Sequence, residues 1–174
     1  LGLNEWFKVV LEANQFEKYQ EVVVLTHNPK FLSNKPDSKA TIRPMELQDI
    51  DEVARVDSLS FEPIWSISQK SLLAAFYQSE HASVAEIEGK IIGYELSTAN
   101  QFSAHLARVA VMPQFQHEHI GYHLVDEMIY SCHKRGIQDI TVNTQDTNRA
   151  SLKLYQNIGF QATGDRFQVY RTSV

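Results

Sequence analysis

The feature that most constrains the fold is an apolar run, a short loop and a long amphipathic helix, in that order. Residues 106–111 are predicted to form a strand that Pro113 ends. Residues 117–134 are predicted to form a helix that Gly136 ends, with an apolar stripe made of Ile120, Leu124, Val125, Met128, Ile129 and Cys132. The first turn of such a helix presents N–H groups and the positive end of its dipole to the loop. This arrangement suits a pyrophosphate.

The remaining periodicities place this unit in a mixed sheet flanked by helices. Strands are predicted over residues 41–45, 82–87, 91–99 and 137–143, and a helix over residues 47–54. A second helix, which reaches Tyr77, is capped by Ser66 or Ser68. Glu88-Gly89 joins two of the strands as a tight turn. Asn148 opens a short helix that ends near Gly159, and residues 160–171 are predicted to form a closing pair of strands. The predicted order is β-α-α-β-β-β-α-β-α-β-β, an α/β fold.

The composition and charge of the chain argue against some classes of function. The chain has 174 residues, 43% of them hydrophobic, and a formal charge of −5. No apolar stretch is long enough for a membrane helix, and no secretory leader is visible. The charge argues against a nucleic-acid partner and suits a cationic substrate such as an amine. Cys132 is the only cysteine, which fits a reducing, cytoplasmic setting.

Residues 1–30 do not fit the predicted order. Residues 6–13 are helix-like and residues 16–26 are rich in β-formers, and this helix–turn–Phe–strand order resembles residues 155–160 and the run that follows them. We therefore expect residues 1–30 to be the last helix and strands of a preceding, similar domain, residues 31–40 to be a linker, and residues 41–174 to be the main domain. The alternative is an unrelated extension packed on that domain. Two pairings of the 16–26 strand stay open, a homodimer or an upstream repeat.

Two motifs carry a resemblance to a known family. Gln116 and Gly121 frame a stretch that resembles the Gln/Arg-x-x-Gly-x-Gly/Ala coenzyme A motif of the GNAT superfamily, with His119 at the usual middle glycine. The block from Asn148 to Phe160 resembles the Asn-x-x-Ala/Ser-x-x-x-Tyr-x-x-x-Gly-Phe signature of the same family. Residues 61–66 resemble the first helix–loop of the RimI-like subgroup, which acetylates ribosomal-protein N-termini. The resemblance spans nearly all of residues 41–174 and implies the GNAT acyl-CoA N-acyltransferase fold.

The resemblance implies acetyl-CoA as co-substrate, and it implies the residues that hold it. The backbone of Val109, Ala110 and Val111 would bind the pantetheine arm and polarise the thioester carbonyl. The backbone of Gln116, His117, Glu118, His119, Ile120, Gly121 and Tyr122 would bind the pyrophosphate. Tyr155 would protonate the departing sulfur as general acid, and Asn148 would contact the cofactor. A bulky His119 at a glycine position would either crowd the pyrophosphate or contact it.

The general base stays open at this point. The RimI-like subgroup has a glutamate where this chain has Asn143, which cannot accept a proton. The candidates are Glu62, Glu95, His105 or a chain of water molecules. Cys132 is expected to be a buried thiol rather than a nucleophile, because the thioester is already activated.

The predicted function is transfer of an acetyl group to a primary amine by direct attack. The acceptor is a protein N-terminus, a lysine or a small-molecule amine, and it would enter between residues 61–66 and the final strands. The alternative is a degenerate, non-catalytic GNAT-like module with a binding or assembly role. His119 and His123 lie one helical turn apart, but no third ligand is evident, so no metal is expected.

Overall fold

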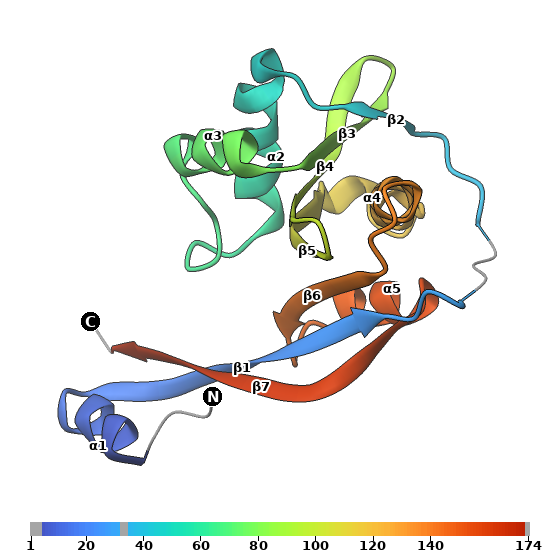
Figure 1. Ribbon diagram of the computed structural model, residues 1–174. Helices are drawn as coiled ribbons and strands as arrows, with labels where there is room; N and C mark the ends of the chain where they lie inside the picture. Colours follow the sequence, from blue (N-terminus) through green and yellow to red (C-terminus); the bar gives the residue numbers. More distant parts are fainter. Residues whose placement is uncertain (1–4, 32–34, 173–174) are drawn as a thin grey trace.

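The computed structural model describes residues 5–31 and 35–172 (Figure 1). Its helices are α1 (Glu5–Ala13), α2 (Ile50–Ser60), α3 (Gln69–Gln78), α4 (Ile120–Lys134) and α5 (Arg149–Asn157). Its strands are β1 (Phe16–His27), β2 (Thr41–Pro44), β3 (His81–Ile87), β4 (Lys90–Ala99), β5 (Ser103–Val111), β6 (Asp139–Gln145) and β7 (Phe160–Thr172). Short 3-10 turns cover Leu47–Asp49 and Pro113–Phe115. The predicted mixed α/β fold is confirmed.

The strands form one seven-stranded sheet in the order β2-β3-β4-β5-β6-β1-β7. All neighbours are antiparallel except β5 and β6, which run parallel. The closing pair of strands predicted within residues 160–171 is instead the single strand β7. Its partner is β1, which lies between β6 and β7. The likeness between the two ends of the chain was visible in the sequence, but their pairing was not, because the paired residues are far apart in sequence.

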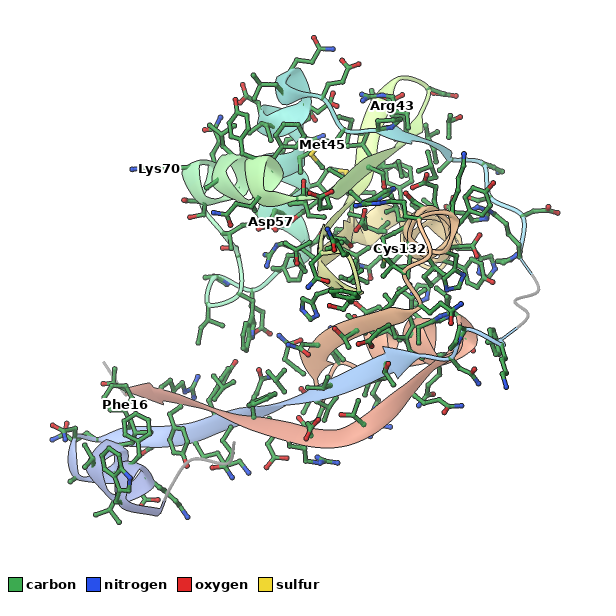
Figure 2. All side chains as sticks on the ribbon, viewed as in Figure 1. Phe16, Arg43, Met45, Asp57, Lys70 and Cys132 are labelled. Carbon is green, nitrogen blue, oxygen red and sulfur yellow. The ribbon has the colours of Figure 1, made fainter. Side chains whose placement is uncertain are left out.

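Adjacent residues of β4 show that the helices cover both faces of the sheet. Successive side chains of a strand point to opposite faces. The Tyr94 hydroxyl donates to Asp57 of α2, whereas the side chain of Glu95 shares an ion cluster with Glu127 of α4. Helix α2 therefore covers one face and α4 the other. Figure 2 shows Asp57 and Cys132 within these two helical layers.

Local signals set the ends of the elements as predicted. Ser68 caps α3 by accepting the Ser71 N–H, and Asn148 caps α5 by accepting the Ser151 N–H. Glu88 and Gly89 both have positive φ in the β3–β4 turn, which matches a tight hairpin. Cys132 is buried on α4, as expected, and burial raises the pKa of its thiol. Across residues 5–31 and 35–172, no helix combines the length and apolar character needed to cross a membrane.

The segment after β1 contacts the main body of the sheet. The Pro36 carbonyl accepts a hydrogen bond from His123 Nε2 of α4 at 2.7 Å, and Lys35 pairs with Asp126 at 2.9 Å. Phe31 covers Gly159, where a Cβ atom would lie 2.4 Å from its ring and φ is +98°. Part of the predicted 31–40 linker is thus held against α4 and the end of α5.

Candidate active site

Strand β5 is divided into a paired half and an open half. Strand β6 pairs with residues Ser103 to Leu106, and the last pair is Leu106 with Val142. We call residues 108–111 the open half, because β6 no longer accompanies β5 there. The division coincides with a β-bulge at Ala107, since Leu96 opposes Arg108 whereas Ser97 opposes Leu106. A bulge bends its strand and increases the local twist, which separates β5 from β6.

The backbone of the open half presents N–H groups to the gap. The Met112 N–H donates to the Ile92 carbonyl of β4 at 2.8 Å. Hydrogen bonds alternate along an antiparallel pair, so Ala110 also bonds to β4. Val109 and Val111 therefore direct their N–H groups to the other edge, where β6 has diverged. Of the three residues predicted to hold the pantetheine arm, these two have amides directed to the gap.

The loop before α4 forms the second part of the site. The N–H groups of residues 117–122 donate to no acceptor within the described parts of the chain. His117 and His119 adopt the left-handed conformation, with φ of 68° and 60°. Histidine is among the side chains that tolerate this region best after glycine and asparagine. A tight turn of free amides at the positive end of a 15-residue helix is a favourable anion site.

The side chains of residues 116–119 are exposed. His119 makes no side-chain capping bond, so its imidazole does not occupy the N–H groups of the turn. Gln116 folds back to donate to the Val111 carbonyl at 3.1 Å, which ties the loop to the end of the open half. A Cβ atom on Gly121 would lie 3.3 Å from Leu154, so this glycine allows α4 and α5 to approach closely.

Tyr155 of α5 shares an apolar cluster with residues of β5 and β6. It is 4% exposed, and it packs in the apolar cluster that contains Leu106 and Val142, the last β5–β6 pair. Val109 of the open half packs against the same cluster. Burial raises the pKa of the Tyr155 phenol, so the hydroxyl keeps its proton at all working pH values. Its position is compatible with the predicted role as general acid.

The three candidate bases lie in different surroundings in the structure. Glu95 is fully buried on the α4 face, where it accepts from Ser97 and lies 2.7 Å from His81 Nδ1. Burial raises the pKa of Glu95. His81 Nε2 also contacts Glu127 at 2.6 Å. Glu95 is thus the interior end of an ion cluster, and no acceptor amine reaches it without breaking that cluster.

Glu62 is exposed, whereas His105 is half-buried on β5 between β4 and β6. Glu62 is exposed in the predicted acceptor loop and accepts a long 3.4 Å bond from Tyr19 of β1. His105 Nδ1 contacts Thr141 Oγ1 at 2.9 Å, and burial lowers the pKa of its imidazole. Asn143 follows Thr141 by two residues on β6, and its side chain is exposed where β6 leaves β5.

Sequence reasoning missed the buried cluster that holds the acceptor loop. Asp57 is fully buried, and its Oδ2 accepts from Tyr94 and from Arg108 Nε, both at 2.5 Å. Arg108 also donates to the Trp65 carbonyl at 2.7 Å and stacks over the Phe61 ring at 4.0 Å. The one available signal was a charged residue, Arg108, within an apolar strand.

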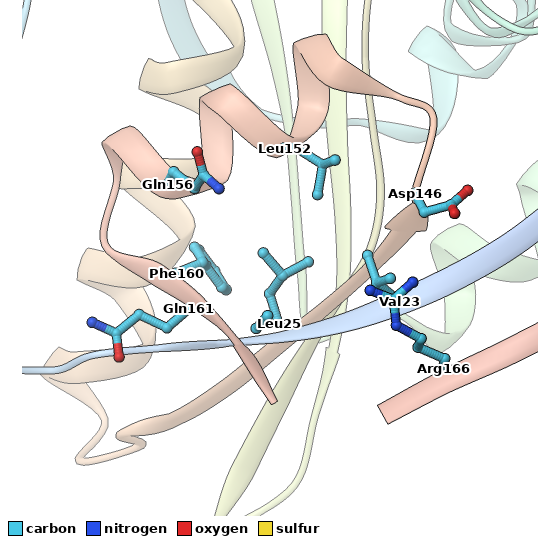
Figure 3. A pocket seen from close by; sticks show the side chains of 9 residues that line it. Val23, Leu25, Asp146, Leu152, Gln156, Phe160, Gln161 and Arg166 are labelled. Carbon is cyan, nitrogen blue, oxygen red and sulfur yellow. The ribbon is translucent and has the colours of Figure 1, made fainter. Parts of the chain in front are cut away.

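A separate hollow of 430 Å³ lies between α5, β1 and the start of β7 (Figure 3). It is lined by Val23, Leu25, Asp146, Leu152, Gln156, Phe160, Gln161, Ala162 and Arg166. None of these residues belongs to the predicted site. The gap beside the open half, with two directed amides and an anion-binding turn, is the better fit for an extended acyl-carrier arm that ends in phosphates.

The sheet, the parted strands and the amide-rich turn define an acyl-CoA-dependent transferase. Residues 49–160 match the model of the acetyltransferase (GNAT) family. The chain belongs to this family, and it is an acetyl-CoA-dependent N-acetyltransferase.

Named relatives agree with this assignment. A Bacillus subtilis strain 168 protein, named as a candidate [ribosomal protein bS18]-alanine N-acetyltransferase, is 26% identical over 135 residues, which are 76% of this chain and 88% of that protein. The crystal structure of the Escherichia coli ribosomal-protein-S18-alanine N-acetyltransferase matches with a TM-score of 0.64 and 22% identity, over 70% of this chain and 77% of that one. A GCN5-related N-acetyltransferase from Sphaerobacter thermophilus matches with a TM-score of 0.76 and 14% identity, over 96% and 56%. At these identities the two structures support the fold alone.

Proposed function

We propose that the protein transfers the acetyl group of acetyl-CoA to the α-amine of a protein N-terminus. The observation that carries this proposal is the open half of β5 beside the amide-rich turn of α4. Val109 and Val111 would hold the pantetheine arm and polarise the thioester carbonyl, and residues 117–122 would hold the pyrophosphate. The relatives named above supply the acceptor class.

The chemistry requires a neutral amine and a protonated leaving group. The amine nitrogen forms a bond to the carbonyl carbon, the carbon–sulfur bond breaks, and the sulfur takes a proton from the Tyr155 hydroxyl. The amine releases a proton to water or to Glu62. Asn148, whose side chain caps α5 about two turns before Tyr155, would contact the cofactor on the same helix.

The lack of a strong base at Asn143 favours an α-amine over a lysine. At pH 7.4 about 20% of an α-amine with a pKa of about 8 is neutral, against about 0.1% of a lysine with a pKa of about 10.4. An enzyme with only weak assistance to deprotonation therefore gains most from the acceptor that is already partly neutral. The exposed Glu62 carboxylate and the Tyr19 hydroxyl at the predicted acceptor loop would offer a hydrogen-bond acceptor and a donor to a peptide end.

The test is an acceptor screen read by release of free coenzyme A thiol. Three acceptors are compared: a peptide with a free N-terminus, the same peptide acetylated at its N-terminus with one internal lysine, and a small polyamine. We expect the free N-terminus to react at least about tenfold faster than the other two. Equal or faster reaction of the lysine peptide would refute the α-amine assignment. We also place this reaction in the cytoplasm, where the single buried Cys132 needs no disulfide partner.

A further inference from the structure

The N-terminal unit α1–β1 repeats the unit α5–β7 in detail. Both helices have nine residues, and a phenylalanine begins each following strand. After α1, the Asn14 N–H donates to carbonyls three and four residues earlier, and the Gln15 N–H donates three residues back. After α5, the N–H groups of Ile158 and Gly159 make the same bonds. The residue before each phenylalanine has positive φ, 63° at Gln15 and 98° at Gly159.

The two units are arranged about an approximate two-fold axis. Strands β1 and β7 are antiparallel over their whole length, with Phe16 opposite Thr172 and His27 opposite Phe160. The start of each strand therefore lies against the end of the other. Figure 1 shows the consequence, with α1 and α5 at opposite ends of the β1–β7 ribbon.

Only one end of this ribbon carries a core in the described structure. Strand β6 pairs with β1 over Val22–Thr26. The other edge of the ribbon is the outer edge of β7, which has no strand beside it among the described residues. At the α1 end, Trp6 is 64% exposed and Val10 is 45% exposed. A 13-residue edge strand and an apolar helix surface left uncovered are features that proteins normally shield.

We propose that a second core of the same fold completes the ribbon at this end. Its strand equivalent to β6 would pair with the outer edge of β7 over the C-terminal half, residues 166–172. Its last helix and last strand would be α1 and β1, so it would be the segment that precedes Leu1 in the natural polypeptide. The two cores would exchange their last strands, because β1 sits in this core and β7 would sit in the other.

The structure favours this occupant over a second copy of the chain. In a second copy, the edge of β6 that would receive β7 is already filled by that copy's own β1. A second copy has only its β2 and β7 edges to offer to β7, and neither pairing would supply the strand equivalent to β6 beside α1. A core that is followed by α1 and β1 in the same polypeptide, by contrast, would pack on that unit as the described core packs on α5 and β7.

The repeat also distinguishes the two cores, in a corollary that rests on the proposed function. Superposing the two turns sets Leu11 at the position of Tyr155, and in the sequence Asn4 falls at the position of Asn148. Leucine has no proton to give, so the second core would lack the general acid. All acetyl transfer by the natural polypeptide would then come from the core described above.

The proposed pairing of β7 with the second core is called the seam. Hydrogen exchange tests the seam without reference to activity. The natural polypeptide, which the proposal expects to carry the second core upstream of Leu1, is compared with the 174-residue chain. We expect amides within residues 166–172 to exchange at least about tenfold more slowly in the natural polypeptide. Equal exchange rates, or a reading frame without a foldable segment upstream, would overturn the proposal. So would a 174-residue chain that dimerises and protects the same amides by itself.

A matched pair of variants locates the contact. Val10→Lys changes an exposed residue of α1 whose counterpart, Leu154, packs against the core. Leu59→Lys changes an α2 residue that is 50% exposed and lies outside the ribbon. In the natural polypeptide, Val10→Lys should remove the protection of residues 166–172 and Leu59→Lys should preserve it; equal effects would count against the seam.

Tyr155→Phe in the natural polypeptide tests the corollary separately. Total acetyl transfer should fall at least about 100-fold, the usual effect of losing a general acid. A fall to about half would show a second active core and overturn the corollary while leaving the seam intact. Failure of the acceptor screen would concern the proposed function alone, because the exchange measurement does not depend on turnover.

Discussion

The two halves of β5 show that one strand can pair on both sides at one end and leave an edge open for binding at the other. Residues Ser103 to Leu106 are held on both sides, by β4 and by β6. Residues 108–111 pair with a neighbouring strand only on the β4 side, yet they contain the backbone groups that the proposed chemistry would use. An unpaired strand edge inside a domain is normally costly, because its N–H and C=O groups lose their partners. The open half must therefore be fixed by other means.

Buried charges on both faces provide this support. Arg108 of the open half binds Asp57 and Tyr94 on the α2 face. Glu95, which lies opposite Val109 in the β4–β5 register, is held by His81 on the α4 face. The paired half has no comparable cluster among the described residues. We infer that side-chain networks replace the lateral hydrogen bonds that β6 would have supplied.

The largest effect is expected from removing the support on the α2 face. Arg108→Met leaves the Asp57 carboxylate buried with two neutral donors, the Tyr94 hydroxyl and the Ile67 N–H, and frees the Trp65 carbonyl. The free energy of unfolding should fall by about 3–5 kcal/mol, the usual result of leaving one member of a buried ion pair. Urea unfolding measures the change, and Arg55→Met, at an exposed i,i+3 pair on α2, is the control. Equal effects of the two variants would show that Arg108 is not a support.

The cluster of His81 with Glu95 and Glu127 on the α4 face predicts that the stability of the protein depends on pH. Burial alone would lower the pKa of His81, but the carboxylates of Glu127 and Glu95 raise it to about 10. A raised folded-state pKa stabilises the protein fully below the unfolded value of 6.5, and this stabilisation is lost as pH rises through about 10. The melting temperature should fall across that window by several degrees. His81→Gln should melt lower at pH 6.5 and show a flatter profile; an unchanged slope would contradict the assignment.

A smaller change in free energy is expected from the substitution of Tyr155. Tyr155→Phe should lower kcat about 100-fold, which is about 2.7 kcal/mol, with little change in KM for acetyl-CoA. The reason is that, in the proposed mechanism, the hydroxyl would give its proton to the departing sulfur, whereas the ring packs in the cluster that contains Leu106 and Val142. Steady-state kinetics measures both constants. A KM that rises while kcat is preserved would remove Tyr155 from the proton transfer.

The smallest effect is expected in the turn before α4. His119→Gly relieves a left-handed backbone conformation, and should stabilise the protein by about 1 kcal/mol or raise the melting temperature by about 2–4 °C. Acetyl-CoA binding should persist, because the exposed imidazole is not needed for the backbone amides to bind phosphate. Calorimetry checks this. Loss of binding would show that the His119 side chain itself contacts the cofactor.

Much of the fold could be predicted because its signals are local. The Glu88-Gly89 turn, the Ser68 and Asn148 caps and the stripe of α4 each depend on residues a few positions apart. The insertion of β1 between β6 and β7 could not be predicted, because it joins residues more than a hundred positions apart. The sequence showed the resemblance between the two ends of the chain, but it did not show that those ends pair with each other.

The candidate site likewise combines features that could be predicted from the sequence with features that could not. The two family motifs located the α4 turn, the block around Tyr155 and the strand before them. The bulge at Ala107 is invisible in sequence, because it depends on the register of β4 against β5. The Asp57–Arg108 and His81–Glu127 contacts join separate elements across the sheet, so no spacing rule could have found them. Glu95 was a candidate base for lack of this information.

The most direct test of the open half is an amide-resolved titration of the ¹⁵N-labelled chain with acetyl-CoA. The account predicts saturable shifts of the Val109, Val111, Gly121 and Tyr122 amides at micromolar concentrations, since these N–H groups lack partners. The Ala110 amide, which is bonded to β4, should move much less. If these four resonances stay in place at millimolar acetyl-CoA, the gap beside β5 does not bind the cofactor.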